Sequence, residues 1–155
     1  MESIIQKAIN TVINGKVNKV GRASNLLWIV TEVEQNIQYC FNIQCNWRIV
    51  QDNIAVLTAN DMYLPCQIAG DNFDCDVLGN SKFDEKVLEI NKMLFDKNII
   101  AVNAFEAGDI SILLEDDIII EIFVRDGEEG EMWRFFQHKS SNPHLVVYSN
   151  KCGLE

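Results

Sequence analysis

The sequence predicts an α+β fold, with two helices and antiparallel sheets in a single domain that spans residues 1–155. Three observations predict it. Apolar residues recur at helical spacing near residues 3–13 and again near residues 83–95. Short stretches of alternating apolar and polar residues follow each of these segments, a pattern typical of half-buried strands. Helices and strands are therefore segregated along the chain, unlike the single alternation of a doubly wound parallel sheet.

The first half begins with a predicted helix, Ser3–Ile13, in which Ile5, Ile9 and Val12 form one apolar stripe. The dipeptide Asn14-Gly15 ends it, because both residue types tolerate a left-handed backbone. Strands are then predicted at Lys16–Gly21, Leu26–Val33, Ile37–Gln44, Trp47–Gln51 and Ile54–Thr58.

The second half follows a polar, irregular connection, Ala59–Asn80, which contains the acidic run Asp71–Asp76. A helix is predicted at Phe83–Phe95, since Ser81 precedes acids that favour a first helical turn. Further strands are predicted at Ile99–Phe105, Ile110–Leu114, Ile118–Val124, Met132–Phe136 and Leu145–Tyr148.

The two halves repeat the same order of elements. Each has one helix and then four or five strands, and Trp47-Arg48 in the first half has a counterpart in Trp133-Arg134. This order indicates duplicated α-β-β-β-β halves, with pseudo-repeats at residues 1–60 and 81–150. Chance similarity of two ordinary halves is the alternative, and whether the halves share one sheet stays open.

Composition restricts the classes of partner. Acidic residues outnumber basic ones 23 to 13, which gives a net charge of −10. Such a surface repels the phosphates of nucleic acids and of anionic membranes, so neither is an expected partner. A basic protein is the complementary partner, although the charge has the alternative role of keeping the chain soluble. The oligomeric state stays open.

The sequence also predicts a cytoplasmic location. The N-terminal residues lack the unbroken apolar core of a signal peptide. The five cysteines are odd in number and form no C-x-x-C pair, so we expect free thiols in a reducing compartment.

Arg48 and Arg134 are the main candidate site residues. Each follows a tryptophan that is expected to enter the core, so alternation turns the arginine to the opposite face. Asp61 and Glu131 are the candidate carboxylate partners, one near each Trp-Arg strand. Two interpretations are open: ion pairs that fix neighbouring strands, or an arginine pair that binds a ligand between the halves.

No catalytic, cofactor or metal site is predicted. His138 and His144 flank Ser140 and Ser141, but the sequence has no nucleophile elbow that would accompany a catalytic serine. Three acidic clusters lack the spacing of a calcium-binding loop and are interpreted as turns and solvated loops: Asp71–Asp76, Glu115–Asp117 and Asp126–Glu131.

Three stretches carry a resemblance to other proteins: Phe41–Ile49, Asp61–Pro65 and Glu131–Phe136. Their Gln-Cys-x-Trp-Arg-Ile and Trp-Arg-Phe-Phe segments resemble those of a small bacterial protein family, over roughly residues 25–148. That family has no assigned activity, so the resemblance implies no functional residue. In size and acidity the chain is also similar to immunity proteins of bacterial toxin systems, which implies a basic toxin domain as partner.

The leading hypothesis is therefore a non-enzymatic, cytoplasmic, acidic binding protein, of the kind that inhibits a basic toxin domain. In this hypothesis acidic loops steer towards and block a cationic site, and exposed aromatic residues anchor the contact. The alternative is a small-ligand-binding protein or an enzyme that uses the arginines and carboxylates named above in a cleft between the halves.

Overall fold

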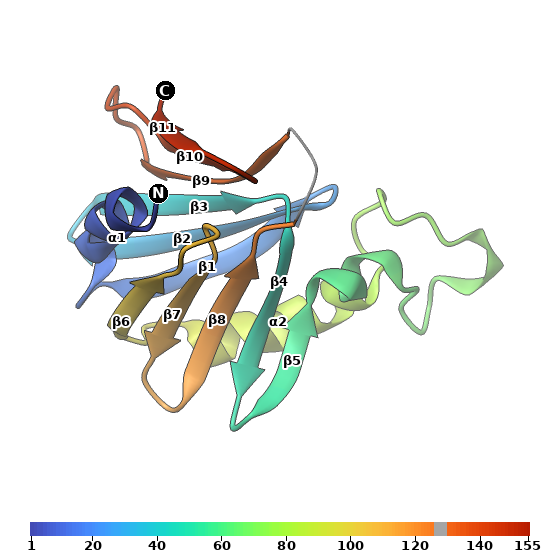
Figure 1. The fold of residues 1–155 in the computed structure, drawn as a ribbon. Coiled ribbons are helices and arrows are strands. Elements are labelled where there is room, and N and C mark those ends of the chain that lie inside the picture. Colours follow the sequence, from blue (N-terminus) through green and yellow to red (C-terminus); the bar gives the residue numbers. More distant parts are fainter. Residues whose placement is uncertain (126–129) are drawn as a thin grey trace.

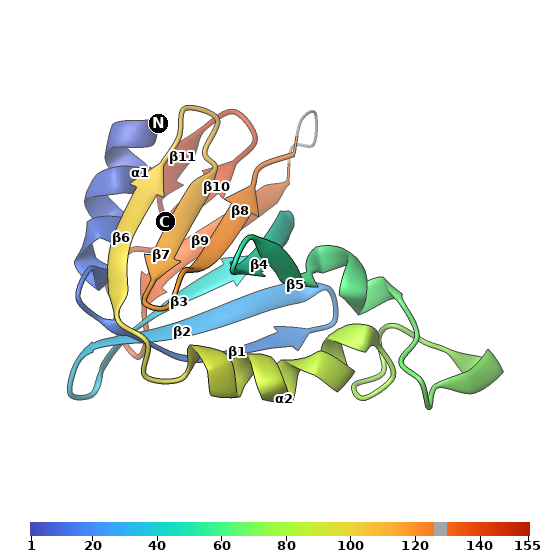
Figure 2. The same ribbon diagram turned by 90° about the horizontal axis from the view of Figure 1, so that it is seen from below.

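The computed structural model describes residues 1–125 and 130–155. Two antiparallel sheets lie across one core, and one helix lies beside an edge strand of each sheet (Figures 1 and 2). This arrangement confirms the predicted α+β class.

Among the described residues, six strands form sheet A and five form sheet B. Sheet A contains, in spatial order, β1 (Lys16–Ala23), β2 (Leu26–Glu34), β3 (Ile37–Ile43), β9 (Glu131–Gln137), β10 (Leu145–Tyr148) and β11 (Cys152–Leu154). Sheet B contains, in spatial order, β5 (Ile54–Thr58), β4 (Asn46–Gln51), β8 (Ile118–Phe123), β7 (Ile110–Leu114) and β6 (Ile99–Ala104). The helices are α1 (Glu2–Ile9) and α2 (Lys82–Leu94).

Both halves of the chain cross from one sheet to the other. The first half places β1–β3 in sheet A and β4–β5 in sheet B, whereas the second half places β6–β8 in sheet B and β9–β11 in sheet A. The exchange pairs β3 with β9 and β4 with β8. Each sheet therefore contains strands from both halves. In each half a helix is followed by three strands of one sheet, and the chain then crosses to the other sheet.

Each helix also fixes the free edge of a sheet through one amide side chain. Gln6 of α1 donates to the Val102 carbonyl at 2.9 Å and accepts from the Ala104 amide at 2.7 Å, along β6. Asn91 of α2 accepts from the Val20 amide at 2.8 Å and donates to its carbonyl at 2.9 Å, along β1. Because β1 and β6 are edge strands, these contacts satisfy backbone groups that no neighbouring strand pairs.

Several predicted boundaries are wrong. The first helix ends at Ile9 and continues as a 3₁₀ turn, Asn10–Val12, because consecutive β-branched residues disfavour an α-helix there. Within the connection predicted to be irregular, Ala59–Tyr63 and Gly70–Asn72 form 3₁₀ helices η2 and η3. The short strand β11 was not predicted, since three residues around a glycine show no alternation.

The two tryptophans of the Trp-Arg pairs lie in the common core. Trp133 is fully buried, and its indole Nε1 donates to the Gly108 carbonyl at 3.0 Å. Trp47 packs edge-on against Phe83 of α2, with ring centroids 6.0 Å apart. One core cluster thus joins both sheets and α2.

Candidate functional site

A loop, Leu64–Asn80, projects from the body of the fold between η2 and α2 (Figures 1 and 2). It contains no Lys, Arg or His. Three of its carboxylates are exposed, those of Asp71, Asp74 and Asp76. Apolar side chains are exposed beside them: Ile68 is 90% exposed and Leu78 is 68% exposed. Exposed apolar groups next to like charges are typical of a surface that binds an oppositely charged protein.

Hydrogen bonds close the base of this loop. The Cys66 amide donates to the Asn80 carbonyl at 2.8 Å, and the Lys82 amide donates to the Leu64 carbonyl at 2.8 Å. The Cys66 thiol also lies 3.4 Å from the Gly79 carbonyl. The two ends of the loop are therefore held together as a short, ladder-like stem.

Arg22 of β1 fastens the loop to sheet A. Its side chain is only 1% exposed, and its Nε and Nη2 atoms donate to the Asp84 carboxylate at 2.8 and 2.6 Å. Nη1 donates to the carbonyls of Ser24 and Cys75 at 2.9 and 2.7 Å. Nη2 also donates to the Val77 carbonyl at 3.2 Å. All five N–H donors of the guanidinium thus have an acceptor, which fixes two carbonyls of the loop against the strand.

Asp84 connects this anchor to the start of α2. The Ser81 side chain caps the helix, and Asp84 accepts in return from the Ser81 hydroxyl at 2.9 Å and amide at 3.2 Å. The Gly79 amide donates to the same carboxylate at 3.0 Å. Burial opposes ionisation, but hydrogen bonds from Arg22, Ser81 and Gly79 outweigh it and hold the pKa of Asp84 well below its usual range.

This depressed pKa predicts acid sensitivity of the anchor. The unfolded chain protonates Asp84 near a pKa of about 3.9, before the folded protein does, so the stabilisation is complete above that pH and is lost as the pH falls towards the folded pKa. We expect the free energy of unfolding, measured in urea, to fall between about pH 5 and about pH 3 more steeply for the natural protein than for Asp84→Asn. Equal slopes would contradict the assignment.

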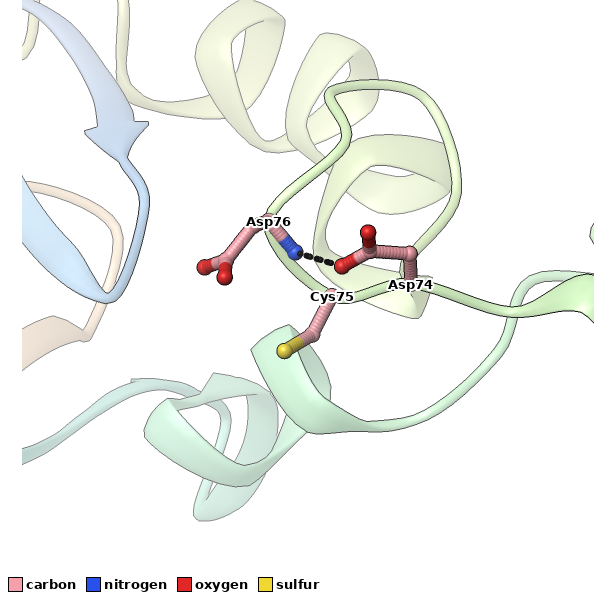
Figure 3. Close-up of side chains that lie close together, drawn as sticks. All are labelled: Asp74, Cys75 and Asp76. Atoms are coloured by element: carbon pink, nitrogen blue, oxygen red, sulfur yellow. Dashed lines mark hydrogen bonds between the residues drawn. The ribbon is translucent and has the colours of Figure 1, made fainter.

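Asp74, Cys75 and Asp76 are the described residues that come nearest to a metal-binding group, with their ligand atoms within 4.8 Å of one another. Figure 3 shows the Asp74 carboxylate turned towards the Asp76 backbone amide, which donates to it at 2.9 Å. The Asp76 carboxylate accepts from the Ser24 hydroxyl at 2.7 Å. The first hydrogen bond stabilises a turn at Asp74–Asp76, and the second connects this turn to Ser24 at the end of β1. The cluster therefore has a structural explanation that needs no metal ion.

The structure brings Arg134 and Glu131 together. Arg134 Nε and Nη2 donate to the two carboxylate oxygens of Glu131 at 2.7 and 2.5 Å. Arg134 Nη1 also lies 3.2 Å from His144 Nδ1, and the His144 ring stacks on Phe136 with centroids 4.4 Å apart. The hydrogen bonds that Arg134 donates to the Glu131 carboxylate raise the pKa of Arg134. This group connects β9 to the residue just before β10, as a structural ion pair would.

Arg48 and Asp61, in contrast, do not meet, and their predicted pairing is wrong. Arg48 pairs with Glu121, which lies directly opposite it across the β4–β8 ladder. Asp61 is turned inward, where it accepts from the Thr58 amide at 2.9 Å in a capping box. Lys86 of α2 is its ion-pair partner, at 2.9 Å. Strand register thus decides the partner of Arg48, and register is not visible in the spacing of residues along the chain.

Arg48 and Arg134 lie on the outer faces of different sheets. Their preceding tryptophans are buried in the shared core, so each arginine points away from it. Arg48 borders a shallow depression of about 260 Å³ on the outer face of sheet B, together with its partner Glu121. Arg48, Asp61, Glu131 and Arg134 therefore do not line one cleft between the halves.

Sequence reasoning did not single out Arg22 and Asp84, the two residues that hold the loop. One signal could have identified Arg22. In β1 it follows Val20 at a spacing of two, so it occupies an inward-facing position where a charge requires a partner. The partner is 62 residues further along the chain, and sequence spacing does not reveal it.

The other acidic clusters have local roles or lie elsewhere. Glu115 accepts from the Asn98 amide and side chain, both at 2.9 Å, and these bonds lower the pKa of Glu115. Asp116 pairs with Lys97. Of the cluster Asp126–Glu131, residues 126–129 lie outside the described residues.

All five cysteines are free. Burial raises the pKa of the Cys45 thiol to about 12, so this cysteine is not a thiolate near neutral pH. It lies at the corner where the chain passes from β3 to β4. Packing at this corner accounts for its position.

Comparison with protein families, curated proteins and solved structures gave no match. None of the helices in the described part of the chain has the length and apolar character needed to cross a membrane. The functional argument therefore depends on the geometry of the site itself.

Proposed function

We propose that this protein is a non-enzymatic, cytoplasmic binding protein that inhibits a basic partner, as an immunity protein inhibits a toxin domain. One observation carries the proposal: the loop Leu64–Asn80 presents exposed carboxylates and exposed apolar side chains, with no basic residue among them. The carboxylates would meet a cationic site. Ile68 and Leu78 would supply apolar anchors.

The anchoring of the loop supports this function. Ordering a free loop on binding costs conformational free energy, and that cost is smaller when the loop is already held in place. Arg22 and the stem at Cys66 fix the loop before any partner arrives. The net charge of −10 also accelerates encounter with a cationic partner. The free thiols suit a reducing compartment such as the cytoplasm.

Two variants of equal net charge test the proposal. The loop variant carries Asp71→Asn, Asp74→Asn and Asp76→Asn, and the control carries Glu34→Gln, Asp52→Asn and Glu106→Gln, at exposed positions outside the loop. Both have a net charge of −7. Proteins from the native host are captured on the natural chain, and each captured partner is purified and titrated against all three proteins at increasing salt concentrations.

We expect a basic partner whose affinity falls with salt and is about tenfold or more weaker for the loop variant than for the control. The apolar contribution to partner affinity is tested with Ile68→Ser, which removes an apolar anchor without a change of charge and should also weaken binding. Equal losses in the two triple variants would assign the effect to overall charge rather than to the loop. An acidic partner, or affinity that does not respond to salt, would contradict the proposal.

A further inference from the structure

The outward face of α2 exposes apolar side chains in the body of the fold, apart from the loop. Leu88 lies near the middle of the helix and is 70% exposed, and Phe95, directly after its last residue, is 64% exposed. An open groove of about 630 Å³ runs between α2 and β1, with Leu88, Lys92 and Phe95 on one side and Lys19 on the other. An exposed leucine and an exposed phenylalanine beside such a groove are typical of an interaction site, where a partner surface would bury both side chains.

The charges of α2 differ from those of the rest of the chain. Lys82–Leu94 contains three lysines and three acidic residues, so the helix is neutral within a chain of net charge −10. Asp84 is already neutralised by Arg22, and Lys86 by Asp61. This face is therefore a place where two copies of an acidic protein can approach without strong repulsion.

The exposed charges are also self-complementary about Leu88. Glu85 lies three residues before Leu88 and Lys92 lies four residues after it, so all three share one side of the helix. Within one copy Lys92 pairs with Glu89 at 2.8 Å, but both side chains are largely exposed, so this ion pair contributes little and Lys92 can exchange it for another carboxylate. In an antiparallel pair of identical helices with Leu88 at the centre, Glu85 of each copy faces Lys92 of the other. The two-fold axis repeats this contact, so one helix face supplies two oppositely charged pairs around an apolar centre.

We propose that the outward face of α2 is the interface of a symmetric homodimer, in which two α2 helices pack antiparallel across Leu88. The pairing of Glu85 with Lys92 across the axis selects a second copy as the occupant. Antiparallel helix dipoles add to the attraction. The loop Leu64–Asn80 projects beyond the N-terminal end of α2 (Figures 1 and 2), so both loops of the dimer stay accessible. An interface of one short helix from each copy is small, so the dimer depends on concentration.

Charge reversal and its rescue test the dimer. The molar mass of the full chain is measured by light scattering and sedimentation over a wide range of concentrations. Glu85→Lys and Lys92→Glu each place like charges opposite one another twice, and we expect each to raise the dissociation constant by about tenfold. The double variant restores opposite charges and keeps the natural net charge, so its dissociation constant should return to the natural value.

Leu88→Asp is expected to abolish the dimer, whereas Ile100→Asp serves as the matched control on an exposed isoleucine of β6 and should leave it intact. A chain that stays monomeric at every concentration would overturn the proposal and leave this face to a different protein. A dimer that survives Leu88→Asp would place the interface elsewhere. Failure of the double variant to recover the dimer would refute the antiparallel register. None of these outcomes bears on the loop, which is tested separately.

Discussion

Replacement of Arg22 by alanine is expected to lower the free energy of unfolding by about 3–5 kcal/mol, because it leaves the Asp84 carboxylate in a largely buried site without its cationic partner. The side chain of Arg22 is 1% exposed and that of Asp84 is 11% exposed, so water replaces little of the lost interaction. The carbonyls of Cys75 and Val77 lose their donor in the same step. Urea denaturation measures the loss, and amide hydrogen exchange in Leu64–Asn80 measures the release of the loop.

A second ion pair of α2 provides the control. Lys86 pairs with Asp61, but its side chain is 44% exposed, so Lys86→Ala should cost about 1 kcal/mol or less. If Arg22→Ala costs no more than Lys86→Ala, the buried ion pair does not hold the loop.

The double variant Arg22→Met with Asp84→Leu separates stability from loop order. Apolar residues often replace a buried ion pair without loss of stability, so this variant should regain part of the free energy lost by Arg22→Ala. The recovery is incomplete because Asp84→Leu also removes the acceptor of the Ser81 and Gly79 amides. The double variant supplies no donor for the loop carbonyls, so amide exchange in the loop should stay fast. Under the proposed function, partner affinity should also fall, because the loop must then be ordered on binding.

The fold class was predictable because it depends on local periodicity. The alternation along Ile37–Gln44 shows that one face of this strand is buried, and the spacing in Phe83–Phe95 shows a helix with one apolar stripe. Neither pattern says which strands become neighbours. Phe41 lies opposite Phe135, and this partner is contributed by the other half of the chain. The exchange of strands between sheets is a property of the whole chain, and single segments do not encode it.

The candidate site was predictable only in its composition. The acidic run Asp71–Asp76 and its irregular surroundings are visible in the sequence, and the structure places them in a projecting loop. The anchor on Arg22 depends on contacts between residues distant in sequence. The partner of Arg48 was wrongly predicted for the same reason, since nearness along the chain to Asp61 does not outweigh the ladder position of Glu121.

Truncation of the tryptophan in each Trp-Arg pair is expected to be as costly as loss of the Arg22 anchor. Trp133→Ala removes a fully buried indole and leaves the Gly108 carbonyl without its donor, so the free energy of unfolding should fall by about 3–5 kcal/mol. Trp47 is 3% exposed and lies on β4 of sheet B, the strand of the first half that corresponds to β9 of sheet A. Trp47→Ala should therefore cost a similar amount, as measured by urea denaturation followed by circular dichroism.

Trp28 is the matched control, because it is the tryptophan that lies outside this core. It is only partly buried, and its indole rests on Gly21, where a Cβ atom would lie 2.1 Å from the ring. Since the cost of truncation follows the area removed from the interior, Trp28→Ala should cost less than either core variant. A cost for Trp28→Ala equal to that for Trp133→Ala would show that the outer face of sheet A contributes as much as the core. Unequal costs for Trp47 and Trp133 would show that the two halves, although alike in topology, differ in how strongly they hold the shared core.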